Sequence, residues 1–560
     1  MDNIRLFLWM GLGVLIWLSY QTWQKDYAPT PTALDSAGLS SPGLQDAEPM
    51  IDDLPSLPEL SASELSPGTT LSTTNNTRTG VGQISAANVI HVQTDVLDIK
   101  INLDGGDLQF AKLPAYPVTK GDPNNSVQLL SGDPANLFVL GSGLYSQEGV
   151  PAPNHRSKFT ATQDEYVLAD GQNQLVVTLH WQGENGLSAE KIYRFYRGSY
   201  AIGLDQVFYN AGTEPYRAGS YLQIKRKYRP PERSMFDVDS YSFVGPVIYD
   251  GEKYKKLDAE DLGEEPFDQA ITHGWIASIQ HHFLVAAVPP AEAARKYTST
   301  FDGNFTLTRV MDSAATSIPV GDQAVFESTL FVGPKLQAQL AEVADGLKLT
   351  VDYGRLTVLA QPLFWLLQKI FDIVGNWGWT IVIVTLLIKL VFYKLTEKSG
   401  RSMAKMRKIA PRLKAVQERH KDDREALSRA MMELYKREKV NPAAGCWPML
   451  IQIPFFIAFY WVLLESVEMR QAPFMLWITD LSTRDPFFIL PLLMGGAMFY
   501  QQKLNPPPPD PMQAKIMQFL PLIFTGMFAF FPAGLVLYWL TNSVLSMAQQ
   551  WRINKVLGAD

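Results

Sequence analysis

Five long apolar segments lie close together in the last third of the chain, and they limit its fold more than any other feature. They are residues 377–393, 446–464, 486–500, 516–531 and 533–550, framed by tryptophan and lysine side chains. Several are at or below the length of about 17 residues that crosses an ordinary hydrocarbon core. Five such runs in one region favour transmembrane helices over the buried core of a soluble protein, and their shortness predicts a locally thinned bilayer. Only Pro532 separates the last two, which predicts a tight helical hairpin.

Another apolar segment, residues 6–18, lies near the N-terminus and has the length of a signal peptide core. No small-x-small cleavage site follows it, and Trp17, Tyr20 and Trp23 resemble the aromatic anchors found at membrane interfaces. We therefore favour an uncleaved transmembrane anchor at residues 1–25 over a cleaved signal. The sequence then predicts an α-helical membrane bundle of six spans, five of which form one core.

Charge in the loops predicts the orientation of these spans. The loop at 394–445 carries 15 Lys and Arg against 7 Asp and Glu, and this excess of positive charge places it in the cytosol. The loop at 465–485 carries two arginines and four acids and is expected outside. Both chain ends, including the tail at 552–560, are then cytosolic. The region up to residue 355 carries 26 Lys and Arg against 42 Asp and Glu, which suits an exported domain.

The exported region divides into a linker and a domain. Residues 26–88 are rich in Pro, Ser, Thr, Ala and Gly and nearly lack aromatic residues, which predicts a flexible tether. Residues 89–350 contain many short runs of alternating polar and apolar residues separated by turn residues, which predicts a large β-sandwich. Helical periodicity occurs in this domain only near residues 336–347. The single cysteine, Cys446, excludes an intrachain disulfide.

The exported domain carries no recognisable catalytic motif. His273, His281 and His282 are the best candidates for metal ligands, but their spacing matches no zinc signature and no HExxH sequence accompanies them. A nucleophile elbow, a P-loop and a dinucleotide-binding fingerprint are also missing from the sequence. We expect a binding or scaffolding module without enzyme activity, metal or cofactor, and no direct recognition of nucleic acid.

Residues 356–374 join the exported domain to the apolar segments. Leucine and isoleucine recur there at helical spacing, with Gln361, Gln368 and Lys369 elsewhere around the helix. This pattern predicts an amphipathic helix that lies along the outer interface of the bilayer. A re-entrant segment is the alternative, and we favour the interfacial helix because Pro362 suits a helix start.

Lys389 is the ionisable side chain that interrupts the first core segment. One interpretation is snorkelling, since a lysine stem can reach the cytosolic headgroups from this depth. The other is a charged lining of a water-filled groove, because charges within a membrane usually face such cavities. Thr385 lies about one helical turn earlier on the same face, and this polar stripe favours the groove.

Two other core segments carry polar and aromatic residues along one helical face. They are Gln452, Phe456 and Tyr460 in the second segment and Tyr538, Asn542 and Gln549 in the last. Residues spaced by about four positions lie one above another on a helix. No fixed partner for these polar groups is evident in the sequence, so we expect them to line the same wet groove.

The cytosolic loop at 394–445 has the pattern of a helical hairpin. Apolar residues recur at intervals of three and four in each half, and the polar residues 420–423 separate the halves. The apolar side chains include Met403, Met406 and Leu413 in the first half and Met431 in the second. Methionine fills gaps in packed cores, but it is also favoured on surfaces that accept varied apolar partners.

Several ordered motifs are shared with a known family. In the core region they are Ser402-Met-Ala-Lys-Met-Arg407, Glu438-Lys-Val-Asn-Pro442, Gly445-Cys-Trp-Pro448, Val467-Glu-Met-Arg-Gln-Ala-Pro473, Asp510-Pro-Met-Gln513 and Phe531-Pro-Ala-Gly-Leu-Val-Leu-Tyr538. In the exported region they are Thr94-Asp-Val-Leu-Asp98, Gly105-Gly106 and Leu113-Pro-Ala-Tyr-Pro117. Through these motifs the chain closely resembles the YidC family of membrane protein insertases over nearly its full length.

The resemblance implies a periplasmic β-supersandwich and a five-helix insertase core in the bacterial inner membrane, with a groove open to cytosol and lipid. It also implies partnership with the Sec translocon and its accessory subunits and with ribosome–nascent chain complexes. The groove charge of the family is usually Arg, and the matching residue here is Lys389, which keeps the charge but lacks the planar donor fork. Trp539 stands where a second tyrosine is common. The tail after Trp551 lacks a long basic extension, so we expect a weak ribosome contact there.

We therefore expect an insertase for nascent membrane proteins that works through a hydrophilic groove in the bilayer. The groove is expected to contain Lys389, Thr385, Gln452, Phe456, Tyr460, Tyr538, Trp539 and Asn542. The hairpin residues Met403, Met406, Leu413 and Met431 are expected to capture the emerging substrate.

Two other functional classes would leave different patterns in the sequence. An ion or solute transporter would show repeated halves with matched broken helices at the membrane midplane, and no such repeat is evident. An intramembrane protease would need a histidine base or a metal motif within the spans. All seven histidines lie outside the apolar segments, which disfavours this class.

Overall fold

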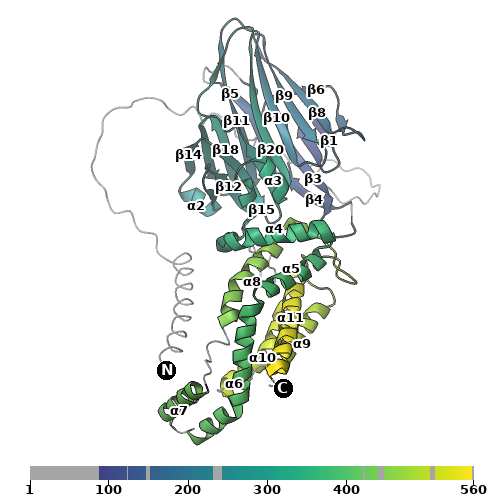
Figure 1. Cartoon of the computed structure of the whole chain (residues 1–560). Coiled ribbons are helices and arrows are strands. Elements are labelled where there is room, and N and C mark those ends of the chain that lie inside the picture. The colour runs from purple at the N-terminus through teal and green to yellow at the C-terminus, as the bar shows by residue number, and fades with distance from the viewer. Residues whose placement is uncertain are drawn as a thin grey trace, which may run out of the picture.

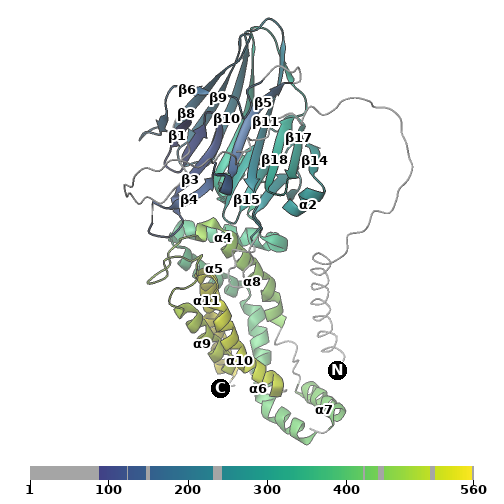
Figure 2. The same cartoon turned by 180° about the vertical axis from the view of Figure 1, so that it is seen from behind.

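The computed structural model describes residues 88–122, 124–146, 152–230, 242–420, 423–438, 447–504 and 511–557. The predicted anchor at 1–25 and the predicted linker, except for its last residue, lie outside the described residues. The described chain forms a β-domain and a group of helices. Helix α4 (Thr357–Val374) lies crosswise between these two parts (Figure 1). The view from behind shows the same arrangement (Figure 2).

The β-domain consists of two large sheets. The order of the first sheet is β14 (Phe267–Ile271), β17 (Arg295–Phe301), β18 (Phe305–Asp312), β11 (Tyr216–Lys227), β5 (Phe138–Ser146), β3 (Asp107–Pro117), β2 (Asp98–Asn102), β1 (Val89–Gln93) and β7 (Glu165–Val167), with β19 (Thr316–Ile318) on β11 and β4 (Ser126–Leu130) on β3. The order of the second is β13 (Tyr254–Lys256), β12 (Gly245–Tyr249), β15 (Trp275–Gln280), β16 (Phe283–Val288), β20 (Gln323–Pro334), β10 (Ala201–Asn210), β9 (Leu187–Tyr196), β8 (Gln174–Gln182) and β6 (Thr160–Ala161). Neighbouring strands pair antiparallel, except β1 with β7.

Alternating side chains explain why these segments form a sandwich. In β9 every second residue from Leu187 to Phe195 is buried, so one face of the strand points inward and the other outward. The inward faces of the two sheets share an apolar core that includes Tyr193, Trp275 and Phe331. The prediction of a β-sandwich for this domain is confirmed.

A short helix in the β-domain, α2 (Ala259–Glu264), was missed by the sequence analysis. Helical structure was expected only near residues 336–347, where α3 (Gln337–Val343) lies, and this expectation is wrong. Six residues are too few to establish a helical period. The available local signal was the cap, because Asp258 Oδ1 accepts a hydrogen bond of 3.0 Å from the backbone N–H of Glu260.

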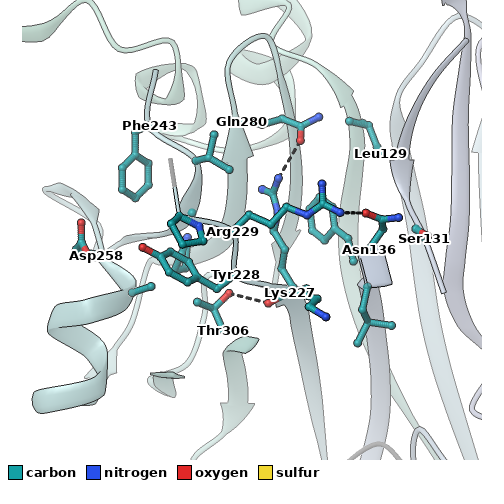
Figure 3. Close-up of a pocket in the computed structure, with 18 of the residues that line it drawn as sticks. Leu129, Ser131, Asn136, Lys227, Tyr228, Arg229, Phe243, Asp258, Gln280 and Thr306 are labelled. Carbon is teal, nitrogen blue, oxygen red and sulfur yellow. Dashed lines mark hydrogen bonds between the residues drawn. The ribbon is translucent and has the colours of Figure 1, made fainter. Parts of the chain in front are cut away.

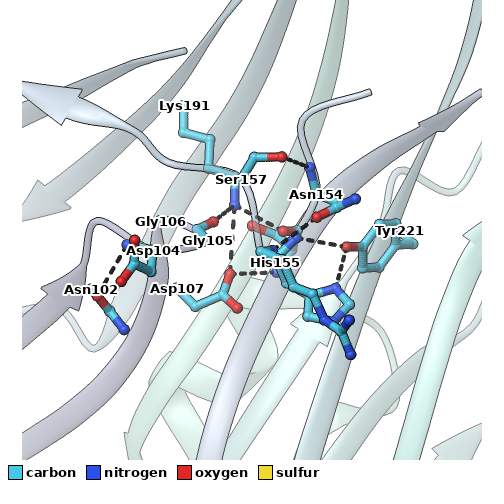
Figure 4. A network of polar contacts seen from close by, with 12 residues as sticks. Asn102, Asp104, Gly105, Gly106, Asp107, Asn154, His155, Ser157, Lys191 and Tyr221 are labelled. Atoms are coloured by element: carbon cyan, nitrogen blue, oxygen red, sulfur yellow. Dashed lines mark hydrogen bonds and ion pairs between the residues drawn. The ribbon is translucent and has the colours of Figure 1, made fainter. Parts of the chain in front are cut away.

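A buried ion pair connects the two sheets (Figure 4). Lys191 of β9 and Asp107 of β3 are almost completely buried, with 3.5 Å between Nζ and Oδ1. Lys191 Nζ also donates to the carbonyl oxygens of Gly105 at 2.6 Å and Ser142 at 2.8 Å. The Ser142 N–H in turn donates to Asp107 Oδ1 at 3.0 Å. Loss of hydration raises the pKa of Asp107 to about 6, although the Lys191 charge opposes this shift.

The turn before β3 requires glycine. Gly105 has a φ of 95°, a conformation that side chains rarely adopt. A Cβ atom at this position would lie 2.4 Å from the backbone oxygen of His155. The backbone therefore comes close enough for the Gly105 carbonyl to reach the Lys191 ammonium, which explains why the glycine pair precedes Asp107.

The helices after α4 form the second part of the structure. They are α5 (Trp377–Val391), α6 (Tyr393–Arg419), α7 (Arg424–Arg437), α8 (Trp447–Glu465), α9 (Ile489–Leu504), α10 (Pro511–Phe528) and α11 (Ala533–Leu557). Helix α11 packs against α5, α6 and α9, and α8 packs against α4. These helices overlap the apolar segments at 377–393, 446–464, 486–500, 516–531 and 533–550, although several ends differ by a few residues.

The helices are short for membrane crossing. By length and apolar composition, α4 is the single helix of the described chain that could span a bilayer alone. Helix α5 and the first part of α6 (Tyr393–Ser402) form a second candidate if they are counted as one span bent by 66°. Shorter apolar stretches are Gln452–Glu465 in α8 and Met517–Phe528 in α10. The number of six spans remains a prediction.

Helix α4 begins before Pro362, so the prediction that this proline marks a helix start is wrong. The helix starts at Thr357, and Pro362 lies within it. Ala360, Leu363, Phe364 and Leu367 are buried on one face. The side chains of Val358, Trp365 and Ile373 are exposed despite being apolar, a distribution compatible with contact to lipid.

The β-domain contacts the helical part through polar groups. The imidazoles of His281 and His282 stack 3.7 Å apart, and both Nε2 atoms lie about 3 Å from the carbonyl oxygen of Leu464 at the end of α8. Burial lowers the pKa of His281 to about 2 and that of His282 to about 4, so both rings are neutral and donate to this carbonyl. These histidines hold the two parts together, and the described chain shows no group of metal ligands around them.

The loop after α8 makes a second set of contacts with the β-domain. Arg470 Nη2 and Gln471 Nε2 donate to the carbonyl oxygen of Pro117 at 3.0 and 2.6 Å. Lys120 Nζ donates back to the carbonyl oxygens of Gln471, at 2.9 Å, and Thr479. Contacts from both sides fix the β-domain against the C-terminal end of α8.

Glu468 makes this junction sensitive to pH. Its Oε2 atom is buried and has no hydrogen-bond partner in the described chain. Loss of hydration raises the pKa of Glu468 to about 7, so this carboxyl group stays protonated to a higher pH in the folded protein than in the unfolded chain.

We expect the contribution of Glu468 to the stability of the protein to fall as the pH rises from about 4 to 7, by on the order of 3 kcal/mol at most. Glu468→Gln should match the wild type near pH 4 and unfold at a higher temperature above pH 7. The apparent unfolding temperature of the full chain in detergent measures the difference. Parallel pH curves for the two proteins would show that Glu468 does not titrate in this way.

Candidate functional site

Lys389 points across the bundle towards α11. It lies near the end of α5, where the side chain is 9% exposed. Its Nζ donates a hydrogen bond of 2.7 Å to Ser546 Oγ of α11. Ser546 Oγ donates in turn to the carbonyl oxygen of Asn542 at 2.7 Å. The lysine therefore connects two helices laterally, an arrangement that simple snorkelling towards the helix end does not require.

Gln452 of α8 extends this chain of polar groups. Its Nε2 donates to Asn542 Oδ1 at 2.9 Å. Lys389, Ser546, Asn542 and Gln452 thus form one line of hydrogen-bonded residues from α5 through α11 to α8, which we call the polar seam. Asn542 takes part with its backbone carbonyl towards Ser546 and with its side chain towards Gln452. Helices α5 and α8 are otherwise strongly apolar, so Lys389 and Gln452 stand out chemically there, whereas α11 also carries Thr541 and Ser543.

Ser546 is the member of the polar seam that the sequence analysis missed. It lies four residues after Asn542 on the same face of α11, and this spacing was the available signal. Gln549 continues the line towards α6. Its Nε2 donates to Thr396 Oγ1 at 2.7 Å, just beyond the bend between α5 and α6.

Thr385 is buried one helical turn before Lys389. Its Oγ1 donates to the carbonyl oxygen of Ile381 at 2.6 Å, so the hydroxyl bonds within its own helix. Such bonds are common for threonine inside helices. Among the described residues, Thr385 therefore lies beside the polar seam and directs its hydroxyl to its own helix instead of to the seam.

The predicted aromatic residues form a cluster beside the polar seam. The Phe456 ring stacks near Tyr538, with centroids 5.9 Å apart, and meets Trp539 edge-on at 4.5 Å. Phe528 of α10 also lies 5.1 Å from Trp539, so the cluster joins α8, α10 and α11. Tyr460 lies farther along α8, near Phe531. The structure thus brings seven of the eight predicted groove residues close to the polar seam, and the eighth, Tyr460, lies farther along α8.

The residues of the predicted hairpin have different environments. Leu413 of α6 is buried together with Ile409 and Leu434, so it serves packing in this structure. Met406 and Met431 are half-buried. The side chain of Met403 lies outside the described residues. The exposed methionine is Met432 of α7, which the sequence analysis did not select.

The chain is similar to known proteins over almost all of its length. The family described as 60Kd inner membrane protein matches residues 369–559, and the family described as YidC periplasmic domain matches residues 89–366. Membrane protein insertase YidC of Thioalkalivibrio sulfidiphilus is 46% identical, covering 99% of this chain and 98% of that protein. Membrane protein insertase YidC of Nitrosococcus oceani is 45% identical and covers 99% of each chain.

A solved structure titled as an active YidC insertase, with its first transmembrane domain resolved, covers 83% of this chain and 92% of that one, at 18% identity and a TM-score of 0.39. The family matches and full-length relatives settle the earlier resemblance. This chain belongs to the YidC family of membrane protein insertases.

Proposed function

We propose that this protein inserts other proteins into the bacterial inner membrane and helps them fold there, without catalysing covalent chemistry. The observation that carries the proposal is the polar seam, in which Lys389, Ser546, Asn542 and Gln452 connect three apolar helices. Burying a polar group inside a membrane costs free energy, so the polar groups that occur there usually serve a function. The seam supports a hydrophilic path for the polar segments of a substrate.

The seam lowers the barrier for moving a polar segment across the bilayer. A polar segment in hydrocarbon loses its hydrogen bonds to water, at several kilocalories per mole for each group. Asn542 and Gln452 offer amide donors and acceptors in place of water, and the ammonium of Lys389 attracts acidic or polar stretches. Short helices and a thinned bilayer shorten the remaining low-dielectric distance.

The apolar part of the substrate leaves towards lipid beside the aromatic cluster. Phe456 and Trp539 lie next to the polar seam, and Trp539 also contacts α10. Helix α10 exposes Phe519, Leu522 and Ile523. Burial of apolar surface contributes about 25 cal/mol per Å², so a typical transmembrane helix strongly favours the inserted state without ATP. The protein therefore acts on the rate, and the substrate supplies the driving force.

The cytosolic hairpin receives the substrate before insertion. Helices α6 and α7 carry half-buried Met406 and Met431, and α7 exposes Met432. Flexible methionine side chains adapt to varied apolar partners. Leu413 contributes by packing the hairpin.

The proposed topology has six spans with both ends in the cytosol and the β-domain in the periplasm. The positive charge of the 394–445 loop supports this orientation. Substrates arrive as ribosome–nascent chain complexes or through the Sec translocon and its accessory subunits. These partners follow from family resemblance.

Site-specific photo-crosslinking tests whether substrates enter the seam. A photoreactive residue at position 452, which leaves Lys389 in place, should capture a short nascent membrane protein stalled on the ribosome. The matched control is position 492 on α9, where Leu492 is exposed and distant from the chain of hydrogen bonds. Adducts should form at least about ten-fold more often at 452 than at 492. This ratio corresponds to a difference of about 1.4 kcal/mol in the free energy of placing the substrate at the two positions. Equal or absent adducts at both positions would contradict substrate entry.

A further inference from the structure

A large pocket lies in the β-domain, away from the polar seam (Figure 3). Its volume is about 840 Å³. The walls come from β4, the ends of β11 and β15, the start of β12 and β5, and the first residues of α2. The labelled side chains of Arg229, Asn136 and Gln280 lie on one side of the opening, and Asp258 lies on the other.

Three cationic residues line this pocket, and none of them forms an ion pair with an acid among the described residues. They are Arg226, Lys227 and Arg229. Arg226 donates to Ser278 Oγ at 3.2 Å, to the Ile279 carbonyl at 3.1 Å and to Gln280 Oε1 at 2.9 Å. Each of these acceptors is neutral, and the ion pairs found among the described residues include none of the three cations.

The other two cations also have neutral neighbours. Arg229 donates to the side-chain oxygen of Asn136, and Lys227 Nζ lies 5.9 Å from the centre of the Phe305 ring. Arg226 is the most deeply placed of the three, and its guanidinium lies 4.5 Å from the Phe138 ring centre. Burial lowers the pKa of Arg226 to about 10, the direction expected for a cation that lacks a counter-charge.

The pocket also contains two acids, Asp258 and Glu260, on the opposite wall. Asp258 caps α2 through the N–H of Glu260, at 3.0 Å, and burial together with the nearby charge of Glu260 raises the pKa of Tyr228. Asp258 lies across Tyr228 from Arg229 in the close-up (Figure 3). Arg226 and Arg229 therefore leave one wall of the pocket positively charged, whereas Lys227, which follows Arg226 in β11, points to the other face of the sheet and lies over Phe305.

The pocket opens beside the junction with the helices. Ser242 and Phe243 line it and also line a smaller cavity of about 130 Å³, whose other walls include Trp461 and Glu465 of α8. Gln280, on the pocket wall, directly precedes His281, which contacts the Leu464 carbonyl. This position is close to the outer end of α8, where the proposed topology places the outer lipid headgroups.

We propose that this pocket binds a phosphate-type oxyanion through Arg226 and Arg229, with the charge of Lys227 close by, and that an anionic lipid headgroup is its expected source. Guanidinium groups bind phosphate with strong, charge-assisted hydrogen bonds, and a bound anion offsets the charge of a buried arginine. The pocket is separate from the polar seam. The proposal concerns binding at the β-domain and does not depend on how substrates are inserted.

The test uses the purified full chain in nanodiscs of phosphatidylcholine that contain a minor fraction of phosphatidylglycerol. Native mass spectrometry then counts the phosphatidylglycerol molecules that stay bound. The pocket variant is Lys227→Gln with Arg229→Gln, both at least partly exposed, so the fold should persist. The control variant is Lys100→Gln with Lys112→Gln, which removes the same charge from two lysines that lie over the Phe110 ring.

Wild type and control should retain phosphatidylglycerol at least about ten-fold more strongly than the pocket variant. A second arm measures the unfolding temperature of each protein in detergent with inorganic phosphate. If phosphate stabilises wild type and control but not the pocket variant, while lipid retention is equal in all three, the oxyanion site is supported and its source is solution. If the pocket variant behaves like wild type in both arms, the proposal is overturned.

Discussion

Lys389→Glu should reduce membrane insertion by at least about 100-fold, whereas Lys389→Arg should stay within a few-fold of wild type. The ammonium of Lys389 bonds to Ser546 between α5 and α11, where the side chain is largely shielded from solvent. A carboxylate there would repel the acidic segments that the lysine attracts. At an effective dielectric constant near 20, reversing one charge at contact distance changes the interaction by several kcal/mol. Arginine keeps the charge, although its planar fork must find a new partner.

Two further variants separate charge from structure. Lys389→Met keeps most of the side-chain volume and should lie between the arginine and glutamate variants. Lys503→Glu makes the same charge change on α9, where Lys503 lies over Phe499 and takes no part in the polar seam. This control should insert at nearly the wild-type rate once protein levels are matched. Equal activity of Lys389→Glu and Lys389→Arg would remove the electrostatic role of the residue.

Lys191→Met should destabilise the β-domain by about 3–5 kcal/mol, the largest stability effect that we expect from a single substitution. The change leaves Asp107 buried between the sheets without its cation, and it also removes the hydrogen bonds to Gly105 and Ser142. Combining Lys191→Met with Asp107→Leu should recover most of this loss, because the double variant buries no charge. Urea unfolding of the full chain in detergent, followed by tryptophan fluorescence, measures the three proteins.

An exposed ion pair provides the control for the buried one. Lys255 and Asp250 lie 3.1 Å apart at the surface, and Lys255→Met should cost less than about 1 kcal/mol. Lys191→Met would be expected to unfold at a clearly lower urea concentration than Lys255→Met. If both variants unfold at the same urea concentration, the Lys191–Asp107 pair does not stabilise the sandwich in the proposed way.

The β-sandwich could be predicted from sequence because its strands are amphipathic. The alternation in β9, from Leu187 to Phe195, is visible without any knowledge of neighbours. The order of strands was not predictable, since β11 pairs with β5 and β18, which are far apart in the chain. The Lys191–Asp107 pair depends on that long-range arrangement, so the sequence alone could not reveal it.

The candidate site was predictable where polar residues interrupt apolar segments. Lys389, Gln452 and Asn542 stand out for this reason, and the structure places all three in one line of contacts. Ser546 is less conspicuous because serine is common inside helices. Leu413 is a residue that the sequence pattern selected for the wrong environment. Its spacing fitted a surface for substrate capture, but its side chain is buried in the structure.

The junction between the β-domain and α8 was not predicted at all. His281 and His282 were considered as metal ligands and rejected because of their spacing, and surface or strand-edge histidines were expected instead. Their bonds to Leu464 depend on a contact across about 180 residues of sequence. Pro362 illustrates a local error of the same origin. A proline favours a helix start by itself, but packing of Ala360 and Leu363 extends α4 back to Thr357.

Reconstitution in liposomes tests the central claim most directly. Liposomes that contain only this purified chain should insert a small two-span membrane protein, detected by protease-protected fragments of the expected size. Empty liposomes, and liposomes with Lys389→Glu at equal protein density, should give only background protection. Equal insertion into empty liposomes and into those containing the wild-type chain would contradict the account.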